Sequence, residues 1–275
     1  MSVSAHGVAA CDDTDLVLGH LMNGVSHTVP RFREEAGSAC LGIRRTRRWL
    51  PVSMTTVGLI GSGNIGATLA RLAVAAGHSV VLSNSRGPDT LRDLVAELGP
   101  SVSAATRDQA AMAGAIVVVT VPLSAYPSLT SVPLAGKAVI DTGNYYPDRD
   151  GHVPELDGGQ LTSSEYLSNY LPGARIVKGC NNIFFKHLLN LARPSGAADR
   201  SYLPIAGDDS ADKAAVAEFL DSIGYGYVDS GPLADSWRQQ PDTPVYAIPY
   251  GSFSDEMGTP ASAEVIRAAL AAATR

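Results

Sequence analysis

Apolar and polar residues follow two alternating patterns from residue 54 to about residue 231. Short runs rich in valine, isoleucine and leucine, such as Ile116–Val119, are typical of strands buried on both faces of a sheet. Between these runs, apolar residues recur three and four positions apart, which is the spacing of an amphipathic helix. We predict strands at residues 56–60, 79–83, around 102, 115–122, 137–143, 174–179, 201–207 and 225–231.

The ends of the helical segments carry their own signals. Gly77 and Gly224 each follow a helical pattern, and glycine in this place allows the left-handed turn that ends many helices. Two threonines start helices with capping-box spacing, Thr106 with Gln109 and Thr162 with Glu165. We predict helices at residues 65–76, 90–98, 106–113, 162–170, 183–192, 211–223 and 261–273.

The alternation of strands and helices predicts the fold class. It is typical of an α/β fold, here a Rossmann-like, doubly wound, mostly parallel sheet with helices on both faces. The composition does not break inside this segment, so we predict a single domain at residues 54–233. Residues 234–275 are rich in proline, glycine and aromatic residues, and we predict that they form an irregular C-terminal arm that includes the last helix.

The first 53 residues show neither pattern. They contain the basic run IRRTRRWL and lack the apolar core of a secretory signal. We predict that residues 1–53 are a poorly ordered N-terminal extension, or an upstream translation of the gene. The alternative is a basic docking arm that uses Arg44, Arg45, Arg47 and Arg48.

Composition and charge narrow the classes of protein. The 275 residues carry a formal net charge of -6, which argues against a nucleic-acid binder or a membrane-surface binder. No apolar stretch approaches the roughly 20 residues that span a bilayer. The three cysteines are far apart and lack metal-ligand spacing, so we expect no metal site and a cytoplasmic location.

Three glycines after the first strand form the pattern G-x-G-x-x-G. Gly61 allows a tight turn, Gly63 allows the backbone to approach a diphosphate, and Gly66 allows close packing of helix on strand. The helix start supplies free N–H groups and a positive dipole end. The pattern predicts a dinucleotide site, and the residues expected to form it are Gly61, Ser62, Gly63, Asn64, Ile65 and Gly66.

The end of the second predicted strand indicates which dinucleotide binds. Sites for NAD usually carry an acid there, which accepts from the ribose 2′-hydroxyl. This chain has Ser83, Asn84, Ser85 and Arg86 instead. A guanidinium can pair with a 2′-phosphate and hydroxyls can donate to it, so we predict NADP(H) as the cofactor.

Three strand exits are the expected place for chemistry, because ligands of such sheets lie beyond the carboxyl ends of the strands. The first exit places Thr120, Val121 and Pro122 beside the nicotinamide. The other exits carry three catalytic candidates, none of them certain: Asp141, Lys178 and Asn181. Asp141 and Lys178 also have structural alternatives, a loop-orienting acid and a strand-end charge. Hydride transfer mainly requires stacking in a dry pocket and needs no strong acid or base.

Several stretches together resemble one known family. They include VGLIGSGNIGATLARLAVAAGHSVVLSNSRG, VVVTVPLSAY, LPIAGDDSADKAAV and VDSGPLADS. The combination, over about residues 55–233, resembles NADP oxidoreductases dependent on coenzyme F420, a deazaflavin. Their nucleotide-binding domain is shared with pyrroline-5-carboxylate reductases and with the reductase domain of STEAP ferric reductases. The resemblance implies hydride transfer between NADPH and a deazaflavin stacked on it.

The resemblance also assigns roles and shows where the chain departs from the family. It implies that Ser62, Asn64 and Ile65 contact the diphosphate, and that Val121 and Pro122 lie by the nicotinamide. Archaeal family members carry a histidine where this chain has Asn181. They also continue as an apolar helix where this chain has WRQQPDTPVYAIPYGSF. The acceptor is therefore either coenzyme F420 or another small molecule.

Two alternative functions stay open at this point. The first is an imine or carbonyl reductase, although such enzymes usually add a helical dimerisation domain for which this chain lacks room. The second is a non-catalytic NADP(H)-binding sensor, which would keep the glycine motif without an acceptor pocket. For the leading hypothesis the partner is a small-molecule hydride acceptor, and a homodimer is the habit of the family.

Overall fold

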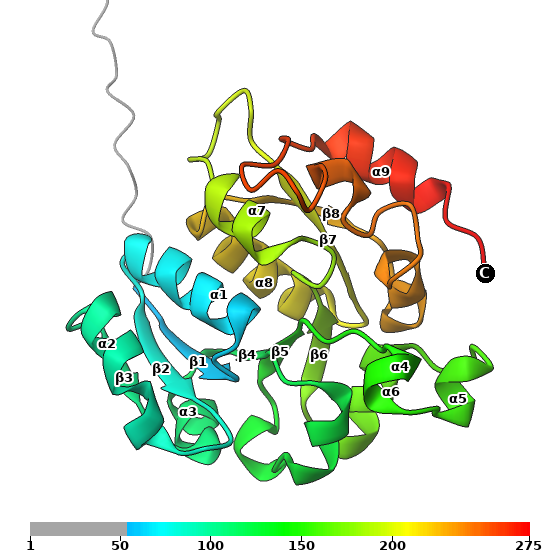
Figure 1. The fold of residues 1–275 in the computed structure, drawn as a ribbon. Coiled ribbons are helices and arrows are strands. Elements are labelled where there is room, and N and C mark those ends of the chain that lie inside the picture. The colour runs from blue at the N-terminus through cyan, green and yellow to red at the C-terminus, as the bar shows by residue number, and fades with distance from the viewer. Residues whose placement is uncertain (1–53) are drawn as a thin grey trace, which may run out of the picture. The chain divides into compact units, whose positions relative to one another are not determined.

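The computed structural model describes residues 54–275, so the predictions for residues 1–53 lie outside the described residues. Within the described part, eight strands form one sheet in the order β3-β2-β1-β4-β5-β6-β7-β8 (Figure 1). The strands are β1 (Thr56–Ile60), β2 (Ser79–Ser83), β3 (Val102–Ala104), β4 (Ile116–Val119), β5 (Ala138–Asp141), β6 (Arg175–Lys178), β7 (Tyr202–Gly207) and β8 (Gly226–Asp229). The predicted strands and the Rossmann-like α/β class are confirmed.

The sheet is parallel from β3 to β6 and changes direction once. β6 and β7 are antiparallel, with Val177 opposite Gly207, and β8 is again parallel to β7. The carboxyl ends of β1 to β6 therefore meet at one edge, and those of β7 and β8 lie at the opposite edge. The chain passes from β1 to β2 on one side and later places β4 on the other side of β1. This reversal of strand order is where such folds bind ligands.

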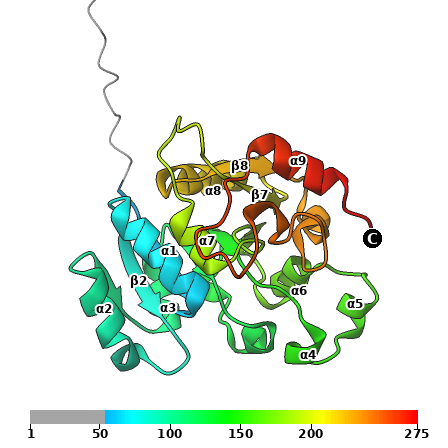
Figure 2. The same cartoon turned by 45° about the horizontal axis from the view of Figure 1, so that its top comes forward.

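Alternate residues of the central strands pack into two different cores. Val57 and Leu59 belong to one core, while Ile60 of the same strand belongs to the other. Successive side chains of a strand point to opposite faces, so a wholly apolar strand such as β4 requires cover on both sides. The first core takes residues from α1 (Asn64–Ala75), α7 (Phe185–Asn190), α8 (Ser210–Ser222) and α9 (Ala263–Ala271), and the second takes residues from α3 (Arg107–Ala113) and α6 (Ser163–Tyr170). In both views α1 and α7 lie side by side (Figure 2).

Most predicted helices occur with boundaries shifted by a few residues. The segment predicted at 90–98 is a 3₁₀ turn, Pro88–Leu91, followed by α2. Both predicted capping boxes are confirmed, those of Thr106 with Gln109 and of Thr162 with Glu165. The helices are α1 (Asn64–Ala75), α2 (Arg92–Leu98), α3 (Arg107–Ala113), α4 (Pro147–Asp150), α5 (Pro154–Asp157), α6 (Ser163–Tyr170), α7 (Phe185–Asn190), α8 (Ser210–Ser222) and α9 (Ala263–Ala271). Two helices of one turn each, α4 and α5, were not predicted.

The C-terminal arm, residues 234–275, runs back toward the carboxyl edge of the parallel strands. It follows β8 through 3₁₀ turns at Leu233–Gln239 and Ile248–Tyr250 and ends after α9. The His187 ring of α7 is hydrogen-bonded to the Asp255 carbonyl, so the arm lies beside α7 (Figure 2). None of the helices found between residues 54 and 275 is long and apolar enough to cross a membrane.

Candidate active site

The glycine turn, residues 61–66, is shaped by close backbone approach at the end of β1. Gly61 has φ +114°, and a Cβ atom there would lie 2.5 Å from the Thr120 carbonyl oxygen. A Cβ on Gly66 would lie 2.2 Å from the Gly61 carbonyl oxygen. Thr120 fixes the turn, because its hydroxyl donates to the Gly61 carbonyl at 2.9 Å. These contacts explain why glycine is required at Gly61 and Gly66.

The start of α1 has backbone N–H donors that no capping side chain uses. Its N-cap residue is Gly63, which has no side chain that could cap the helix, and the first turn contains no acidic residue. The first N–H groups of a helix have no partner inside the helix, so those of Asn64 and Ile65 face outward with the positive dipole end. A Cβ atom on Gly63 would meet no atom within 4 Å, so the backbone here borders open space. The turn thus has both the donors and the room for a phosphate group.

The loop after β2 carries three of the residues predicted to bind a 2′-phosphate. Ser85 and Arg86 are exposed, and their side chains make no hydrogen bond to any residue between 54 and 275. Asn84 holds the loop: its side chain accepts from the Arg86 backbone N–H at 3.0 Å and donates to Thr90 at 2.9 Å. Ser85 and Arg86 are therefore free to bind a ligand, whereas Asn84 is engaged in the loop.

The structure contradicts the prediction for Ser83. The residue is fully buried, and its hydroxyl donates to the Leu59 carbonyl at 2.9 Å. Ser83 is the last residue of β2, where side chains still alternate between the faces of the sheet, and its own points into the sheet. The strand ends at the predicted residue, but the hydroxyl of Ser83 is used inside the sheet and is not available to a 2′-phosphate.

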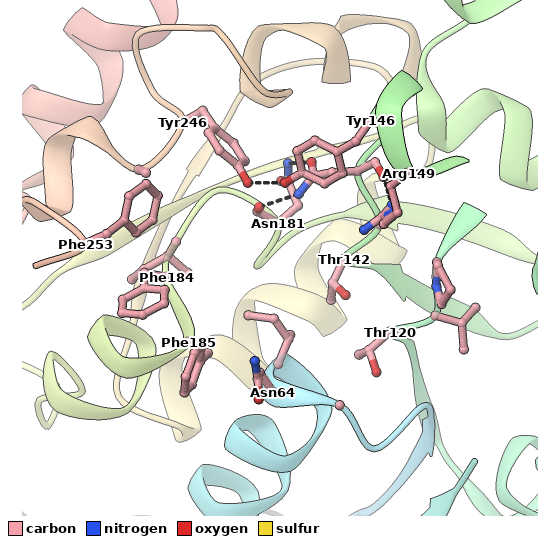
Figure 3. Close-up of a pocket in the computed structure, with 18 residues that line it drawn as sticks. Asn64, Thr120, Thr142, Tyr146, Arg149, Asn181, Phe184, Phe185, Tyr246 and Phe253 are labelled. Carbon is pink, nitrogen blue, oxygen red and sulfur yellow. Dashed lines mark hydrogen bonds between the residues drawn. The ribbon is translucent and has the colours of Figure 1, made fainter. Parts of the chain in front are cut away.

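A cavity of about 340 Å³ connects the glycine turn with the exits of β4, β5 and β6 and with the C-terminal arm (Figure 3). Its volume is at the lower end of the range typical of small-molecule sites. The lining residues are Gly63, Asn64, Ile65, Thr120, Val121, Pro122, Thr142, Gly143, Asn144, Tyr146, Arg149, Asn181, Ile183, Phe184, Phe185, Tyr246, Ala247 and Phe253. The cavity lies at the reversal of strand order, as the fold class predicts.

Asp141 and Lys178, two of the three catalytic candidates, do not line this cavity. They form a fully buried ion pair at 3.0 Å between the ends of β5 and β6. The Lys178 ammonium also donates to the Gly143 carbonyl and the Ser163 hydroxyl, and burial lowers the pKa of Lys178, opposed by Asp141. Asp141 accepts further from the Gly143 backbone N–H at 2.8 Å and from the Ser164 hydroxyl at 2.7 Å. The structure thus gives this pair a structural role, which is to hold the β5 exit loop against β6.

Asn181, the third candidate, lines the cavity but its amide is already engaged. Its Nδ2 atom donates to the Asn144 side chain at 2.9 Å and to the Gln239 carbonyl at 2.7 Å. Its Oδ1 atom accepts from the Gln239 side chain at 3.0 Å. Cys180, the preceding residue, has φ +56°, which turns the chain at the end of β6. With both amide hydrogens used, Asn181 fastens the arm to the sheet and cannot also donate to a substrate.

One side of the cavity is polar. The polar wall consists of Tyr146, Arg149 and Tyr246, and the two tyrosine hydroxyls are hydrogen-bonded to each other. The Arg149 guanidinium lies 4.7 Å from the centroid of the Tyr146 ring and pairs with Asp150 at 2.8 Å. Burial and the bond to Tyr146 raise the pKa of Tyr246, so its phenol stays protonated at neutral pH.

The neighbouring side is aromatic. The aromatic wall consists of Phe184, Phe185 and Phe253, with Phe184 in edge-to-face contact with the other two at centroid distances of 4.7 and 5.3 Å. Ile183 extends the apolar surface. A flat ligand that enters the cavity would contact this surface with a ring face and the polar wall with its edge.

The residues at one end of the cavity were predicted from the sequence, whereas most of those at the other end were not. Six residues predicted to bind the cofactor line the cavity together: Gly63, Asn64, Ile65, Thr120, Val121 and Pro122. No role was predicted for Arg149, Phe253 or Tyr246. Arg149 stands on the unpredicted helix α4, and Phe253 and Tyr246 belong to the arm, whose path no local pattern indicates. The signal that the sequence carries for Tyr246 and Phe253 is their aromatic character in a proline-rich stretch, which does not show that they line a cavity.

Comparison with known proteins agrees with this architecture. The model of the family "NADP oxidoreductase coenzyme F420-dependent" matches residues 56–145. The metalloreductase STEAP3 of Rattus norvegicus is 29% identical over 204 residues, which are 73% of this chain and 38% of that protein. STEAP2 of Mus musculus is 29% identical over 184 residues, 66% of this chain and 34% of that protein. The chain thus spans a little over a third of the length of these two relatives.

Two solved structures match this chain over most of their own length. A hypothetical protein of Sinorhizobium meliloti is 32% identical, with a TM-score of 0.62 over 71% of this chain and 94% of that one. A protein of Arthrobacter sp. FB24 assigned as an F420-dependent NADP-reductase is 25% identical, with a TM-score of 0.55 over 66% of this chain and 87% of that one. Taken with the glycine turn and the cavity at the reversal of strand order, these matches show that the chain belongs to the family of coenzyme F420-dependent NADP oxidoreductases.

Proposed function

We propose that the chain is an NADPH-dependent oxidoreductase that transfers hydride between NADP(H) and a small acceptor, either coenzyme F420 or another molecule. The observation that carries this proposal is the continuity of the cavity. One end is the glycine turn and the other end is the polar and aromatic walls, so a donor and an acceptor can lie in contact inside it. A binding module without chemistry would need only the first end.

The residues of the first end fit NADP(H). The backbone N–H groups of Asn64 and Ile65 would bind the diphosphate, and the open space beside Gly63 leaves room for it. Val121 and Pro122 line the cavity next to the turn, where the nicotinamide half would lie. When bound, the reduced nicotinamide supplies a hydride.

The choice of NADP(H) over NAD(H) depends on the loop after β2. Arg86 and Ser85 are exposed there, and the segment from Ser83 to Gly87 contains no acid that would accept from a 2′-hydroxyl. A guanidinium forms charge-assisted hydrogen bonds to a phosphate, which are about twice as strong as neutral ones. Arg86 would therefore favour the phosphorylated ribose.

The test is a fluorescence titration of the full chain with NADPH and with NADH. Arg86→Ala is expected to weaken NADPH binding roughly 10- to 100-fold, the equivalent of one charged hydrogen-bonding group, and to leave NADH binding unchanged. The matched control is Arg107→Ala, because Arg107 is a partly exposed arginine of α3 that makes a surface hydrogen bond to Ser128. Equal affinities for the two dinucleotides in the unaltered chain would defeat the argument from Arg86.

The acceptor is tested by the absorbance of NADPH on addition of oxidised coenzyme F420. Oxidation with coenzyme F420 supports the proposal as stated. Oxidation only with cyclic imines favours the reductase alternative. NADPH binding without oxidation by any acceptor favours the sensor.

A further inference from the structure

Hydride transfer places a negative charge on the acceptor. Reduction of a conjugated carbonyl or imine in this way forms one C–H bond at carbon and moves an electron pair onto the oxygen or nitrogen. The hydride comes from the reduced nicotinamide, which is oxidised, and water supplies the proton that completes the reduction. A site that accelerates this step holds hydrogen-bond donors where the charge develops.

The catalytic candidates found from the sequence do not qualify. The Lys178 ammonium is fully buried, and its three hydrogens go to Asp141, the Gly143 carbonyl and the Ser163 hydroxyl. The Asn181 amide uses both hydrogens within the protein. None of them has a hydrogen left for an acceptor.

One edge of the Arg149 guanidinium, at Nη1, has no hydrogen-bond acceptor within residues 54–275. Its Nε and Nη2 atoms donate to the two Asp150 carboxylate oxygens at 2.9 and 2.8 Å, and Nη2 also donates to the Asn144 carbonyl at 2.8 Å. Its Nη1 atom makes no hydrogen bond to any of residues 54–275, and the side chain is 48% exposed. Asp150 also accepts from the Tyr146 backbone N–H at 3.1 Å, so its fully enclosed carboxylate is occupied. The ion pair with Asp150 thus fixes the orientation of the guanidinium and leaves Nη1 accessible.

The Tyr146–Tyr246 pair also has one hydroxyl hydrogen that is not used in a hydrogen bond within residues 54–275. Tyr146 and Tyr246 have two hydroxyl hydrogens between them, and their mutual hydrogen bond uses one. No other hydrogen bond of either hydroxyl is made within residues 54–275, so the second hydrogen can be donated to a ligand. Figure 3 shows this pair and Arg149 across the cavity from Asn64 of the glycine turn.

We propose that Arg149 and the Tyr146–Tyr246 hydroxyl pair bind the oxygen or nitrogen atom of the acceptor on which negative charge develops during hydride transfer. The inference rests on the proposed function and names its substrate class: a flat, conjugated molecule whose carbonyl or imine is linked to the carbon that receives the hydride. The aromatic wall, with Phe184 at its centre, would contact the ring face. Arg149 and the two tyrosines then act as catalytic residues.

A non-reducible probe tests this without any turnover. 4-Nitrophenol is flat, its phenolate resembles the charged oxygen, and its ionisation is visible by absorbance. With NADP⁺ present, the unaltered chain is expected to bind the phenolate roughly 10- to 100-fold more tightly than the neutral phenol, as for one charged donor. Arg149→Gln is expected to abolish that preference, Tyr246→Phe to reduce it about threefold, and Arg149→Lys to restore part of it.

Matched controls lie far from the cavity. Arg267→Gln removes an exposed arginine of α9 that pairs with Glu264, and Tyr227→Phe alters a tyrosine of β8 that is 47% exposed. Both are expected to keep the full preference. No preference in the unaltered chain, or the same preference in Arg149→Gln, would overturn the inference.

A kinetic measurement separates this inference from the proposed function. In single turnovers with coenzyme F420, Arg149→Gln is expected to slow hydride transfer about 10²- to 10³-fold, as loss of one such donor does elsewhere. Its affinity for NADPH should change less than about twofold, because Arg149 lies away from the glycine turn. If the unaltered chain is active and Arg149→Gln keeps its rate within threefold, the inference alone fails. If the chain does not bind NADPH at all, the proposed function fails, and the phenolate preference, measured then without NADP⁺, still tests whether Arg149 binds the charged oxygen.

Discussion

At one end of the cavity the donors are backbone N–H groups, and at the other end they are side chains. The glycine turn spans six consecutive residues, and the requirement for Gly61 and Gly66 comes from contacts with neighbouring backbone. The polar wall combines Tyr146 and Arg149, which follow β5, with Tyr246 from the arm, 100 residues further along the chain. The donors of the first end thus come from one short contiguous motif, which Thr120 supports from the end of β4, whereas the donors of the second end come together only when distant segments are held in place.

The two ends therefore should fail in different ways. A change in the glycine turn should remove cofactor binding and leave the rest of the fold in place. A change in the supports of the polar wall should loosen the β5 exit or the arm and leave the glycine turn intact. Three substitutions test this difference.

The largest effect is expected from Lys178→Met, beneath the second end. It leaves the Asp141 carboxylate buried without its counter-charge, which costs about 3–5 kcal/mol of unfolding free energy in comparable cases. Urea denaturation of the full chain measures the loss. The double variant Lys178→Met with Asp141→Asn removes both charges and should recover at least half of it. A single variant as stable as the unaltered chain would show that the pair does not hold the β5 exit.

A smaller effect is expected from Gly66→Ala, at the first end. The new Cβ atom would lie 2.2 Å from the Gly61 carbonyl oxygen, so the turn must shift. We expect NADPH affinity to fall about 100-fold, or about 2.7 kcal/mol. The control is Gly158→Ala at the exposed end of α5, where φ is −80° and a Cβ atom would lie 3.1 Å from its nearest neighbour, the Pro154 carbonyl oxygen. If Gly66→Ala lost its preference for 4-nitrophenolate together with NADPH binding, the two ends of the cavity would not be independent of each other.

The smallest effect is expected from Asn181→Ala, which unfastens the arm. It leaves Gln239 without its main side-chain partner and should cost about 1–3 kcal/mol of stability. Limited proteolysis should then cut residues 240–260 faster than in the unaltered chain. Asn190→Ala removes an exposed bond from α7 to the arm and serves as the matched control, with an expected loss below about 0.5 kcal/mol. If NADPH binding also fell in Asn181→Ala, the two ends would not be independent.

The outcome for individual residues shows where sequence reasoning works. Capping boxes at Thr106 and Thr162 were predicted correctly, because a cap depends on residues three positions apart. The role expected for Ser83 was wrong although the strand ends at the predicted residue, because the alternation of side chains along β2 turns Ser83 into the sheet. Lys178 was found as a strand-end residue, but its burial depends on Asp141, Ser163 and Gly143 from other segments. Charge on a residue does not by itself show whether another segment already neutralises it.

The sequence by itself determined the alternating strands and helices, the glycine turn and the family, because each depends on local spacing or on short contiguous motifs. Only the tertiary structure decided that β7 runs antiparallel to β6, that Asp141 and Lys178 face each other away from the cavity, and that Tyr246 meets Tyr146. These features depend on which distant segments come into contact. Such contacts are set by the packing of the whole chain, and no local pattern of residues records them.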